Sequence, residues 1–95
     1  MPKIEDVLRE REKRLSPLQR KVLEYLESHE DEVYNRETVT ELAEKIGEPK
    51  AWGVYRAMWE LERKGLISKA KVGRRYYYGS HKAIEELVSR LEGSR

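Results

Sequence analysis

Residues 49–79 read PKAWGVYRAMWELERKGLISKAKVGRRYYYG, and this stretch decides the fold of the chain. It holds eight Lys or Arg residues against two Glu, a net charge of +6, while the whole chain carries only +2, so the remaining residues sum to −4. A basic segment set apart in this way is typical of a surface that meets nucleic-acid phosphate. The pattern predicts a helix over residues 50–64 followed by a β-hairpin with a basic tip.

The predicted helix over residues 50–64 has two unlike faces. Its apolar residues recur at i, i+3, i+4 and i+7, the period of a helix that buries one side. They are Val54, Ala57, Met58 and Leu61. The opposite side carries two indoles and two guanidinium groups, from Trp52, Arg56, Trp59 and Arg63. Gly65 is expected to end this helix.

A β-hairpin is predicted directly after this helix. Residues 66–72 alternate over their second half, residues 73–75 (Gly-Arg-Arg) form a turn, and residues 76–78 are three tyrosines, which are strong strand formers. We expect most of these tyrosines to pack on the core while the arginines occupy the exposed tip. Such a tip can lie along a DNA backbone or enter the minor groove.

Another helix is predicted just before the helix over residues 50–64. It starts at Thr38 or Thr40, with Thr38 and Glu41 at the spacing of a capping box, and Gly47 ends it as a left-handed C-cap. Residues 30–37 are predicted to form a loop that ends in a short strand at residues 38–39, which bridges to the hairpin. Two helices joined by a short Gly-containing turn predict a helix-turn-helix.

The flanking segments predict three more helices. Ser16, Pro17 and Gln19 form a strong start for a helix that runs to about residue 29, and they separate it from an N-terminal helix. The narrow apolar stripe of the N-terminal helix suits either the surface of the same domain or half of a dimer seam. Ser80 caps a last helix whose stripe has nothing after it to cover it, which favours self-association. The predicted dimer contacts are Ile4, Val7, Leu8, Ile84, Leu87, Val88 and Leu91.

The order helix, helix, strand, helix, helix, hairpin, helix resembles the winged helix-turn-helix DNA-binding proteins, and within them the arsenical-resistance-repressor-like and multiple-antibiotic-resistance-repressor-like transcription regulators. TELAEKIG at residues 40–47 looks like their second helix, LERKGLI at 61–67 like the end of their recognition helix, and GRRYYY at 73–78 like their wing. The resemblance covers residues 16–79 and implies a homodimer that binds operator DNA. Because the chain has no Cys and no second His beside His81 on the last helix, neither metal site of the arsenical group is expected.

Length and composition fit one domain over residues 1–95, mainly α with a small β-hairpin: an N-terminal helix over 1–15, a winged-helix core over 16–79 and a C-terminal helix over 80–95. The sequence has neither a membrane-length apolar run nor a signal-peptide core, so we expect a cytoplasmic protein. Charged residues make up 40% of the chain, with sixteen Glu against two Asp, a bias typical of thermophiles. No catalytic constellation, metal site or cofactor is expected.

We predict that a homodimer binds double-stranded DNA sequence-specifically and regulates transcription, with no cofactor. In this reading Arg56 reads a guanine through a bidentate pair and Gly53 lets the DNA approach closely. The free N–H groups at Thr40 suit a phosphate, although simple capping explains that residue equally well. The residues expected to contact DNA are Lys50, Trp52, Gly53, Tyr55, Arg56, Thr40, Lys69, Lys71, Arg74 and Arg75.

Trp52 and Trp59 allow three interpretations, because two indoles are seldom left in water without a partner. They pack under the N-terminal helix or a dimer partner, they touch DNA, or they form a site for an effector or a protein. Two alternative functions follow. One is a protein-interaction winged helix that docks its partner through these tryptophans, and the other is an architectural protein that binds DNA without sequence preference.

Overall fold

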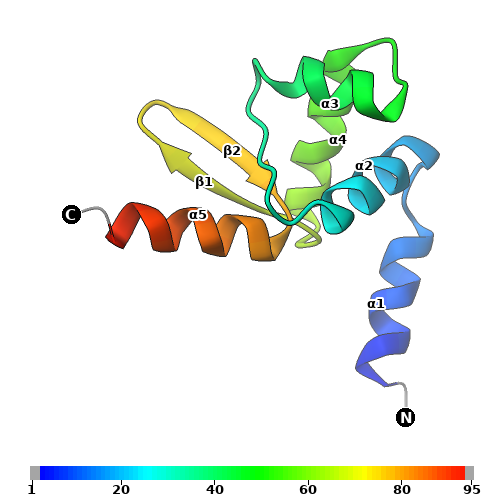
Figure 1. Cartoon of the computed structure of the whole chain (residues 1–95). Helices are drawn as coiled ribbons and strands as arrows, with labels where there is room; N and C mark the ends of the chain where they lie inside the picture. Colours follow the sequence, from blue (N-terminus) through cyan, green and yellow to red (C-terminus); the bar gives the residue numbers. More distant parts are fainter. Residues whose placement is uncertain (1–2, 94–95) are drawn as a thin grey trace.

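The computed structural model describes residues 3–93, apart from the side chains of residue 8 and residues 11–13. It confirms the predicted fold class, because the described residues form five helices and one antiparallel hairpin, which projects to one side of the helices (Figure 1). In chain order the elements are α1 (Ile4–Lys13), α2 (Pro17–Ser28), α3 (Val39–Ile46), α4 (Ala51–Arg63), β1 (Ser68–Val72), β2 (Arg75–Gly79) and α5 (His81–Gly93). None of the described helices combines the length and the apolar character that a membrane span requires.

The core lies where α4 packs against α2 and α3. The four apolar residues predicted for the inner face of α4 are all buried, so that prediction is confirmed. Gly47 has φ +75° and ends α3 in the left-handed conformation, as its position in the sequence predicted. The largest fully buried side chains are Leu26, Leu42, Met58, Leu61, Ile67, Val22 and Val54.

The start of α2 also ties that helix to α4. Ser16 Oγ accepts the Gln19 N–H at 3.1 Å and the Ser16 N–H donates to Gln19 Oε1 at 3.3 Å, which is the predicted capping box. The Gln19 side chain is buried because it also reaches α4, where its amide donates to Glu60 and its Oε1 accepts from Lys64 at 3.2 Å. One capping residue therefore holds two helices in register.

The start of α3 differs from the prediction in two respects. Thr38 is the residue before the helix but makes no side-chain cap, and residues 38–39 form no strand. Asn35 takes over the capping because it is buried one turn earlier: its Oδ1 accepts the N–H of Glu37 at 2.9 Å and of Thr38 at 2.8 Å. The bridge to the hairpin exists, but Tyr34 makes it, with backbone hydrogen bonds of 2.8 and 2.7 Å to Tyr78.

The hairpin presents one face to α4 and the other to α5. Lys69 pairs with Tyr78 and Lys71 with Tyr76 across the two strands, so these four side chains share one face. Only Tyr78 is buried in the core, while Tyr77 is half-buried and Tyr76 is 46% exposed. The expectation that most of the tyrosines pack on the core is therefore wrong, because Tyr76 lies further along the strand, near the exposed tip.

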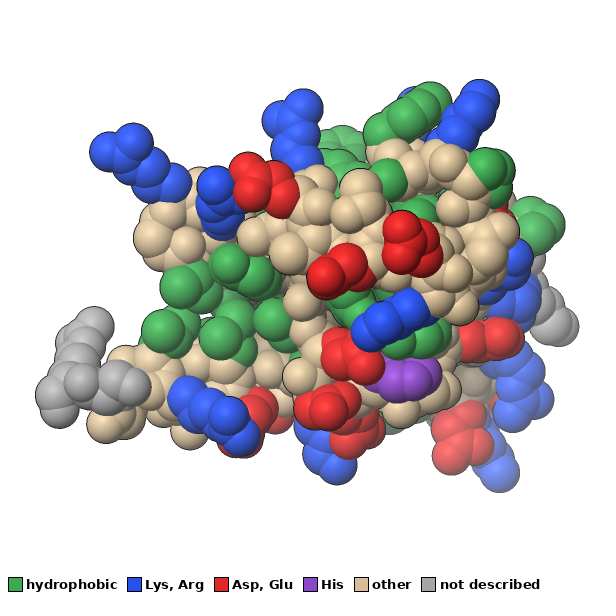
Figure 2. Space-filling model, turned by 45° about the horizontal axis from the view of Figure 1, so that its top comes forward, with side chains coloured by type: hydrophobic (Ala, Val, Ile, Leu, Met, Phe, Trp, Pro, Cys, Tyr) green, Lys and Arg blue, Asp and Glu red, His purple; other side chains and the backbone are tan. Residues whose placement is uncertain are grey.

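Helix α5 packs under both strands of the hairpin, but only along its first turns. Gly79 allows this close approach, since a Cβ there would lie 3.1 Å from the Glu32 carbonyl oxygen and 3.3 Å from the Ala83 Cβ. As predicted, Ser80 caps the helix, its Oγ accepting the Ala83 N–H at 3.1 Å. Beyond this end the apolar stripe is progressively uncovered, and Figure 2 shows hydrophobic side chains in a hollow between the hairpin and α5.

Helix α1 extends away from the other elements (Figure 1). Its apolar residues Ile4 and Val7 are 80% and 54% exposed, and the side chain of Leu8 lies outside the described residues. On α5, Leu87 is half-buried, while Val88 and Leu91 are 36% and 41% exposed. Ile84, also predicted as a dimer contact, is instead buried within its own chain, with 5% of its surface exposed.

Candidate nucleic-acid interface

Helix α4 exposes a ridge made of Trp52, Arg56, Trp59 and Arg63, the face that the sequence placed opposite the core. Trp52 is 66% exposed and Trp59 is 41% exposed. The Arg63 guanidinium lies 4.8 Å from the centre of the Trp59 ring, a cation–π contact that covers part of this indole. Neither indole is buried under α1 of the same chain, so packing under the N-terminal helix is wrong, while contact with a dimer partner, with DNA or with an effector or protein stays a prediction.

The two flanks of α4 face different neighbours. Tyr55 points toward the hairpin, where its ring meets the edge of Tyr78 with 5.7 Å between the ring centres. Burial, together with the nearby Tyr55 hydroxyl, raises the pKa of Tyr78. Gly53 lies on the other flank, where a Cβ would lie 3.8 Å from Leu18 of α2. Gly53 also lines a surface hollow beside Trp52 and Arg56, so its role as a point of close DNA approach stays a prediction.

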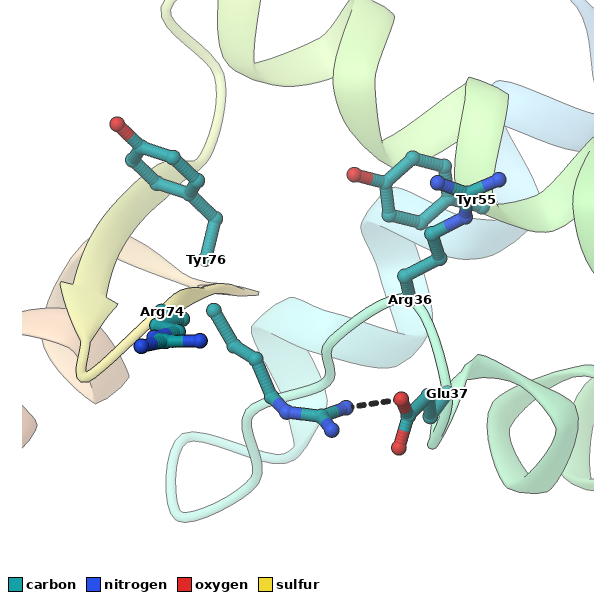
Figure 3. A pocket seen from close by; sticks show the side chains of 6 residues that line it. Arg36, Glu37, Tyr55, Arg74 and Tyr76 are labelled. Carbon is teal, nitrogen blue, oxygen red and sulfur yellow. Dashed lines mark ion pairs between the residues drawn. The ribbon is translucent and has the colours of Figure 1, made fainter.

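A first cleft, of about 340 Å³, separates the hairpin from the turn that leads into α3. Figure 3 shows side chains from three separate segments converging on it. Arg75 is ion-paired with Glu37 across the cleft, and this contact raises the pKa of Arg75. The cleft thus presents three guanidinium groups and one carboxylate, with two phenol rings beside them. The lining residues are Arg36, Glu37, Tyr55, Arg74, Arg75 and Tyr76.

A second cleft, of about 400 Å³, opens between the N-terminal ends of α3 and α4. It shares Arg36 and Tyr55 with the first cleft, so the two form one surface that runs from the hairpin to the ridge of α4. Figure 2 shows Lys and Arg side chains projecting from the upper edge of the molecule, while Asp and Glu gather on the face turned to the viewer. The lining residues of the second cleft are Arg36, Val39, Thr40, Ala51, Trp52, Tyr55 and Arg56.

Lys69 and Lys71 were predicted to lie on the hairpin. Their side chains lie on the face of the hairpin that is directed toward α4. Lys69 forms an ion pair of 3.8 Å with Glu62 of α4, and its ammonium lies 5.1 Å from the centre of the Tyr76 ring. Lys71 lies 5.8 Å from the same ring. Both lysines therefore border the first cleft through Tyr76 rather than standing on the opposite face of the hairpin.

The remaining basic residues near α4 differ in their side-chain partners. Arg56 forms an ion pair of 3.1 Å with Glu60 one turn along the helix. Lys50 is exposed immediately before the helix and, among the described residues, has no carboxylate partner. Lys64 bonds to Gln19 and so lies on the α2 side, away from the hairpin. Six of the eight basic residues of this segment thus lie in the N-terminal half of α4, just before it or on the hairpin, whereas Arg63 and Lys64 lie at the C-terminal end of α4.

Arg36 is the candidate residue that sequence reasoning missed. It lies in a stretch read as an acidic loop, yet the fold brings it to both clefts. Within residues 3–93 neither Arg36 nor Arg74 has a carboxylate partner in the structure. The position of Arg36 just before α3 was the available signal, because side chains at the N-terminal end of a helix-turn-helix lie next to the recognition helix.

The two histidines are occupied by structural contacts. His81 Nε2 donates to the Gly65 carbonyl oxygen at 3.1 Å and its Nδ1 accepts from the Ser68 hydroxyl at 2.5 Å. His29 stacks on Tyr25 with 3.9 Å between the ring centres, and its Nδ1 lies 2.8 Å from the Tyr25 carbonyl oxygen. Within the described part of the chain, no group of three or more His, Asp or Glu side chains is placed to hold a metal ion.

A comparison with known families finds a match over most of the chain. Residues 15–93 match the family described as Penicillinase repressor, and the matched region spans α2 to α5. The broad resemblance to winged-helix transcription regulators is thereby confirmed, whereas the narrower resemblance to the arsenical-resistance and multiple-antibiotic-resistance groups is not. A search of curated proteins and a search of solved structures found no significant match.

Proposed function

The chain belongs to the penicillinase repressor family of winged-helix transcription regulators, and from that premise we propose that it represses transcription by binding a specific sequence of double-stranded DNA. Helix α4 lies in the major groove and the hairpin follows the backbone beside it. The observation that carries this proposal is the convergence of Arg36, Arg74 and Arg75 on the cleft next to the exposed ridge of α4. Binding and regulation, rather than catalysis, are its activity.

The N-terminal half of α4 reads the bases. The major groove admits a helix, and side chains near the N-terminal end of a recognition helix reach base edges. Arg56 suits this role because its present partner is a surface carboxylate, and such an i,i+4 ion pair is worth only about 0.3–0.5 kcal/mol. A bidentate contact with guanine discriminates against the wrong base by roughly 1–3 kcal/mol, so the weak pair with Glu60 does not prevent Arg56 from turning to a base.

The clefts and the hairpin hold the phosphates. Arg36 and Arg74 are exposed residues that line the first cleft, and Lys71 lies on the hairpin over the ring of Tyr76. Contacts of this kind fix the register of the protein on the duplex without carrying sequence information. They also release counterions, so we expect the affinity to fall steeply with salt.

A second copy of the chain covers the apolar surface of α5. The exposed part of its apolar stripe consists of Val88, Leu91 and the half-buried Leu87, next to the hollow under the hairpin. Ile84 is buried within its own chain beneath them. Ile4 and Val7 on α1 offer a further apolar stripe for the same partner. A two-fold dimer places two α4 helices on a nearly palindromic site with half-sites about 10 base pairs apart or a multiple of that.

The working unit in this proposal is the whole chain in the cytoplasm. Residues 16–79 form the winged-helix core, and residues 1–15 and 80–95 flank it as dimer helices. The Glu-rich composition fits a thermophilic source, in which ion-pair networks contribute more to stability than at moderate temperature.

DNA selection tests this proposal directly. Fragments bound by the protein are recovered from a random duplex library, and the affinity for the selected and for unselected DNA is measured at several salt concentrations. Arg56→Ala should reduce the preference for the selected site by roughly tenfold. The double variant Arg36→Ala, Arg74→Ala should weaken binding to both DNAs alike and reduce the salt slope by about 0.9 for each phosphate that is no longer neutralised.

Lys82→Ala is the matched control, because it removes one exposed cation from α5, away from the clefts. Unchanged affinity in all the variants would refute the proposal. Equal affinity of the wild-type protein for every duplex would favour the architectural alternative instead. Retention of a protein partner without salt-sensitive retention of DNA would favour docking through the exposed tryptophans.

A further inference from the structure

The second cleft has an apolar interior on an otherwise charged surface. Val39 forms its floor and is only 2% exposed, and Ala51 and the two aromatic rings of Trp52 and Tyr55 form its walls. The Thr40 hydroxyl donates to the Glu37 carbonyl oxygen at 3.2 Å, so it already has a partner. The two charged residues among its lining, Arg36 and Arg56, are exposed, and we call them the rim of the cleft. No described side chain of the protein fills this cleft.

An apolar hollow of this kind needs a particular group from the DNA. The edges of the base pairs present hydrogen-bond donors and acceptors to the major groove, and the exception is the C5-methyl group of thymine. Arginines on the rim bring phosphate and base edges close, which places an apolar group of the DNA over the hollow. Leaving the hollow empty would expose Trp52 to water in the complex, whereas a methyl group removes apolar surface from water on both sides.

We propose that the cleft between the N-terminal ends of α3 and α4 receives the 5-methyl group of a thymine in the bound DNA, with Trp52 as its principal wall. This proposal rests on the proposed function and adds a specificity determinant to it. Arg56, at the rim, reads the adjoining base pair, and Arg36, at the other side, holds a phosphate. Specificity then comes from one polar and one apolar contact made by consecutive turns of the same helix.

The test replaces each thymine of the selected site by uracil, one position at a time. Uracil keeps the base pair and removes only the methyl group. Affinity is measured for the wild-type protein, for Trp52→Ala and for Trp59→Ala. The last variant is the matched control, because it removes the same side chain from the same ridge at a hollow lined by Arg56, Glu60, Arg63 and Lys64, outside the cleft.

At one position in each half-site, uracil should weaken binding by the wild-type protein and by Trp59→Ala by about fourfold, the loss expected for one buried methyl group. The same replacement should leave Trp52→Ala unchanged, because its cleft no longer has the wall that the methyl group touches. At that position a C·G pair should bind weakly, and 5-methylcytosine should recover part of the loss, since its methyl group occupies a similar place in the groove.

Two results would overturn the inference while leaving the proposed function intact. One is sequence-specific binding that no uracil replacement weakens. The other is a uracil effect of equal size in Trp52→Ala and the wild-type protein, which would assign the methyl contact to another part of the surface. Absence of any sequence preference would refute both proposals. Trp52 is 66% exposed, so Trp52→Ala should remain folded, and its thermal unfolding curve verifies this.

Discussion

Helices α4 and α5 each contain 13 residues with a regular apolar stripe, yet the fold treats them differently. In α4 the four stripe residues are all buried, and the exposed side consists of charged and aromatic residues. In α5 only Ala83 and Ile84 are buried, while Leu87 is half-buried and Val88 and Leu91 are exposed. The difference arises because α2, α3 and the hairpin enclose α4, whereas α5 packs on the hairpin along its first turns alone.

The contrast indicates two kinds of partner. An exposed ridge that carries arginines, beside clefts lined by more arginines, suits a polyanion because these cations attract phosphate. An exposed apolar stripe next to an apolar hollow suits another protein surface, and a second copy of the chain offers the same stripe by symmetry. The apolar stripe of α4 is thus fully buried within the chain, whereas that of α5 is not. Each of the predictions below tests that distinction.

The largest difference should come from truncating one leucine in each stripe. Leu61 of α4 is fully buried, so Leu61→Ala should lower the free energy of unfolding by about 2–5 kcal/mol. Leu91 of α5 is 41% exposed, so Leu91→Ala should change the stability of the single chain by less than about 0.5 kcal/mol. Urea unfolding at several protein concentrations separates the two, because any loss in Leu91→Ala should appear only where the dimer is populated. Similar losses of stability in both variants at low protein concentration would show that the α5 stripe already contributes to the fold of the single chain.

Charge placed on the outer stripe of α5 should dissolve the dimer. In the double variant Val88→Glu, Leu91→Glu two apolar side chains become two carboxylates, which should weaken self-association by roughly 2–4 kcal/mol. Sedimentation should then show a monomer with an unchanged circular dichroism spectrum, and binding to a two-half-site DNA should weaken. Ser89→Glu is the control, because it adds one such charge on the opposite side of the same helix. A double variant that sediments as the wild type does would remove α5 from the interface.

The sequence predicted most of the fold because its signals are local. The apolar period of α4, the capping box at Ser16 and the left-handed Gly47 each depend on residues within about one helical turn. The start of α3 was the exception. There Asn35, a buried residue in a polar loop, replaced the cap expected from Thr38, and only its burial explains why.

The candidate interface was less predictable, because it depends on how distant segments meet. Arg36 reaches both clefts only because the loop before α3 passes beside the hairpin, a contact that no local pattern encodes. The position of Gly53 beside Leu18 of α2 was not predicted, because helical periodicity alone does not say which neighbour each flank of α4 meets. The apolar second cleft is formed by two helix ends together, so neither helix predicts it by itself.

A smaller effect should come from the one carboxylate in the first cleft. Glu37 holds Arg75 and also repels an incoming phosphate, so Glu37→Gln should raise DNA affinity by about fivefold, or roughly 1 kcal/mol. The gain should appear mainly in the association rate at low salt and shrink as salt screens it. Glu41→Gln, on the exposed side of α3 and not part of the cleft, is the control. Weaker binding by Glu37→Gln would mean that the ion pair positions Arg75 for the DNA.

The smallest effect should be a dependence of the free energy of unfolding on acidic pH, caused by Glu32 in the loop between α2 and α3. Glu32 Oε1 accepts hydrogen bonds from Tyr34, from Tyr25 at 2.9 Å and from Lys45 at 3.2 Å, which tie the loop to α2 and α3. The Tyr34 hydroxyl is the main cause that lowers the pKa of Glu32 below its ordinary value of 4.5, with burial opposing it.

Because its pKa is lower in the folded state, this carboxylate contributes stability above about pH 4.5, and the contribution is lost as the pH falls through the folded pKa. Glu32→Gln should therefore be less stable than the wild type at neutral pH, by less than about 1 kcal/mol, and the difference should shrink below pH 4.5. Urea midpoints measured across this range give the difference directly. Glu86→Gln removes the same charge from the surface of α5 and provides the comparison. If both variants lose the same stability at every pH, the hydrogen bonds to Glu32 contribute no more than a surface charge does. The contacts between the loop and α3 would then not contribute measurably to the free energy of unfolding.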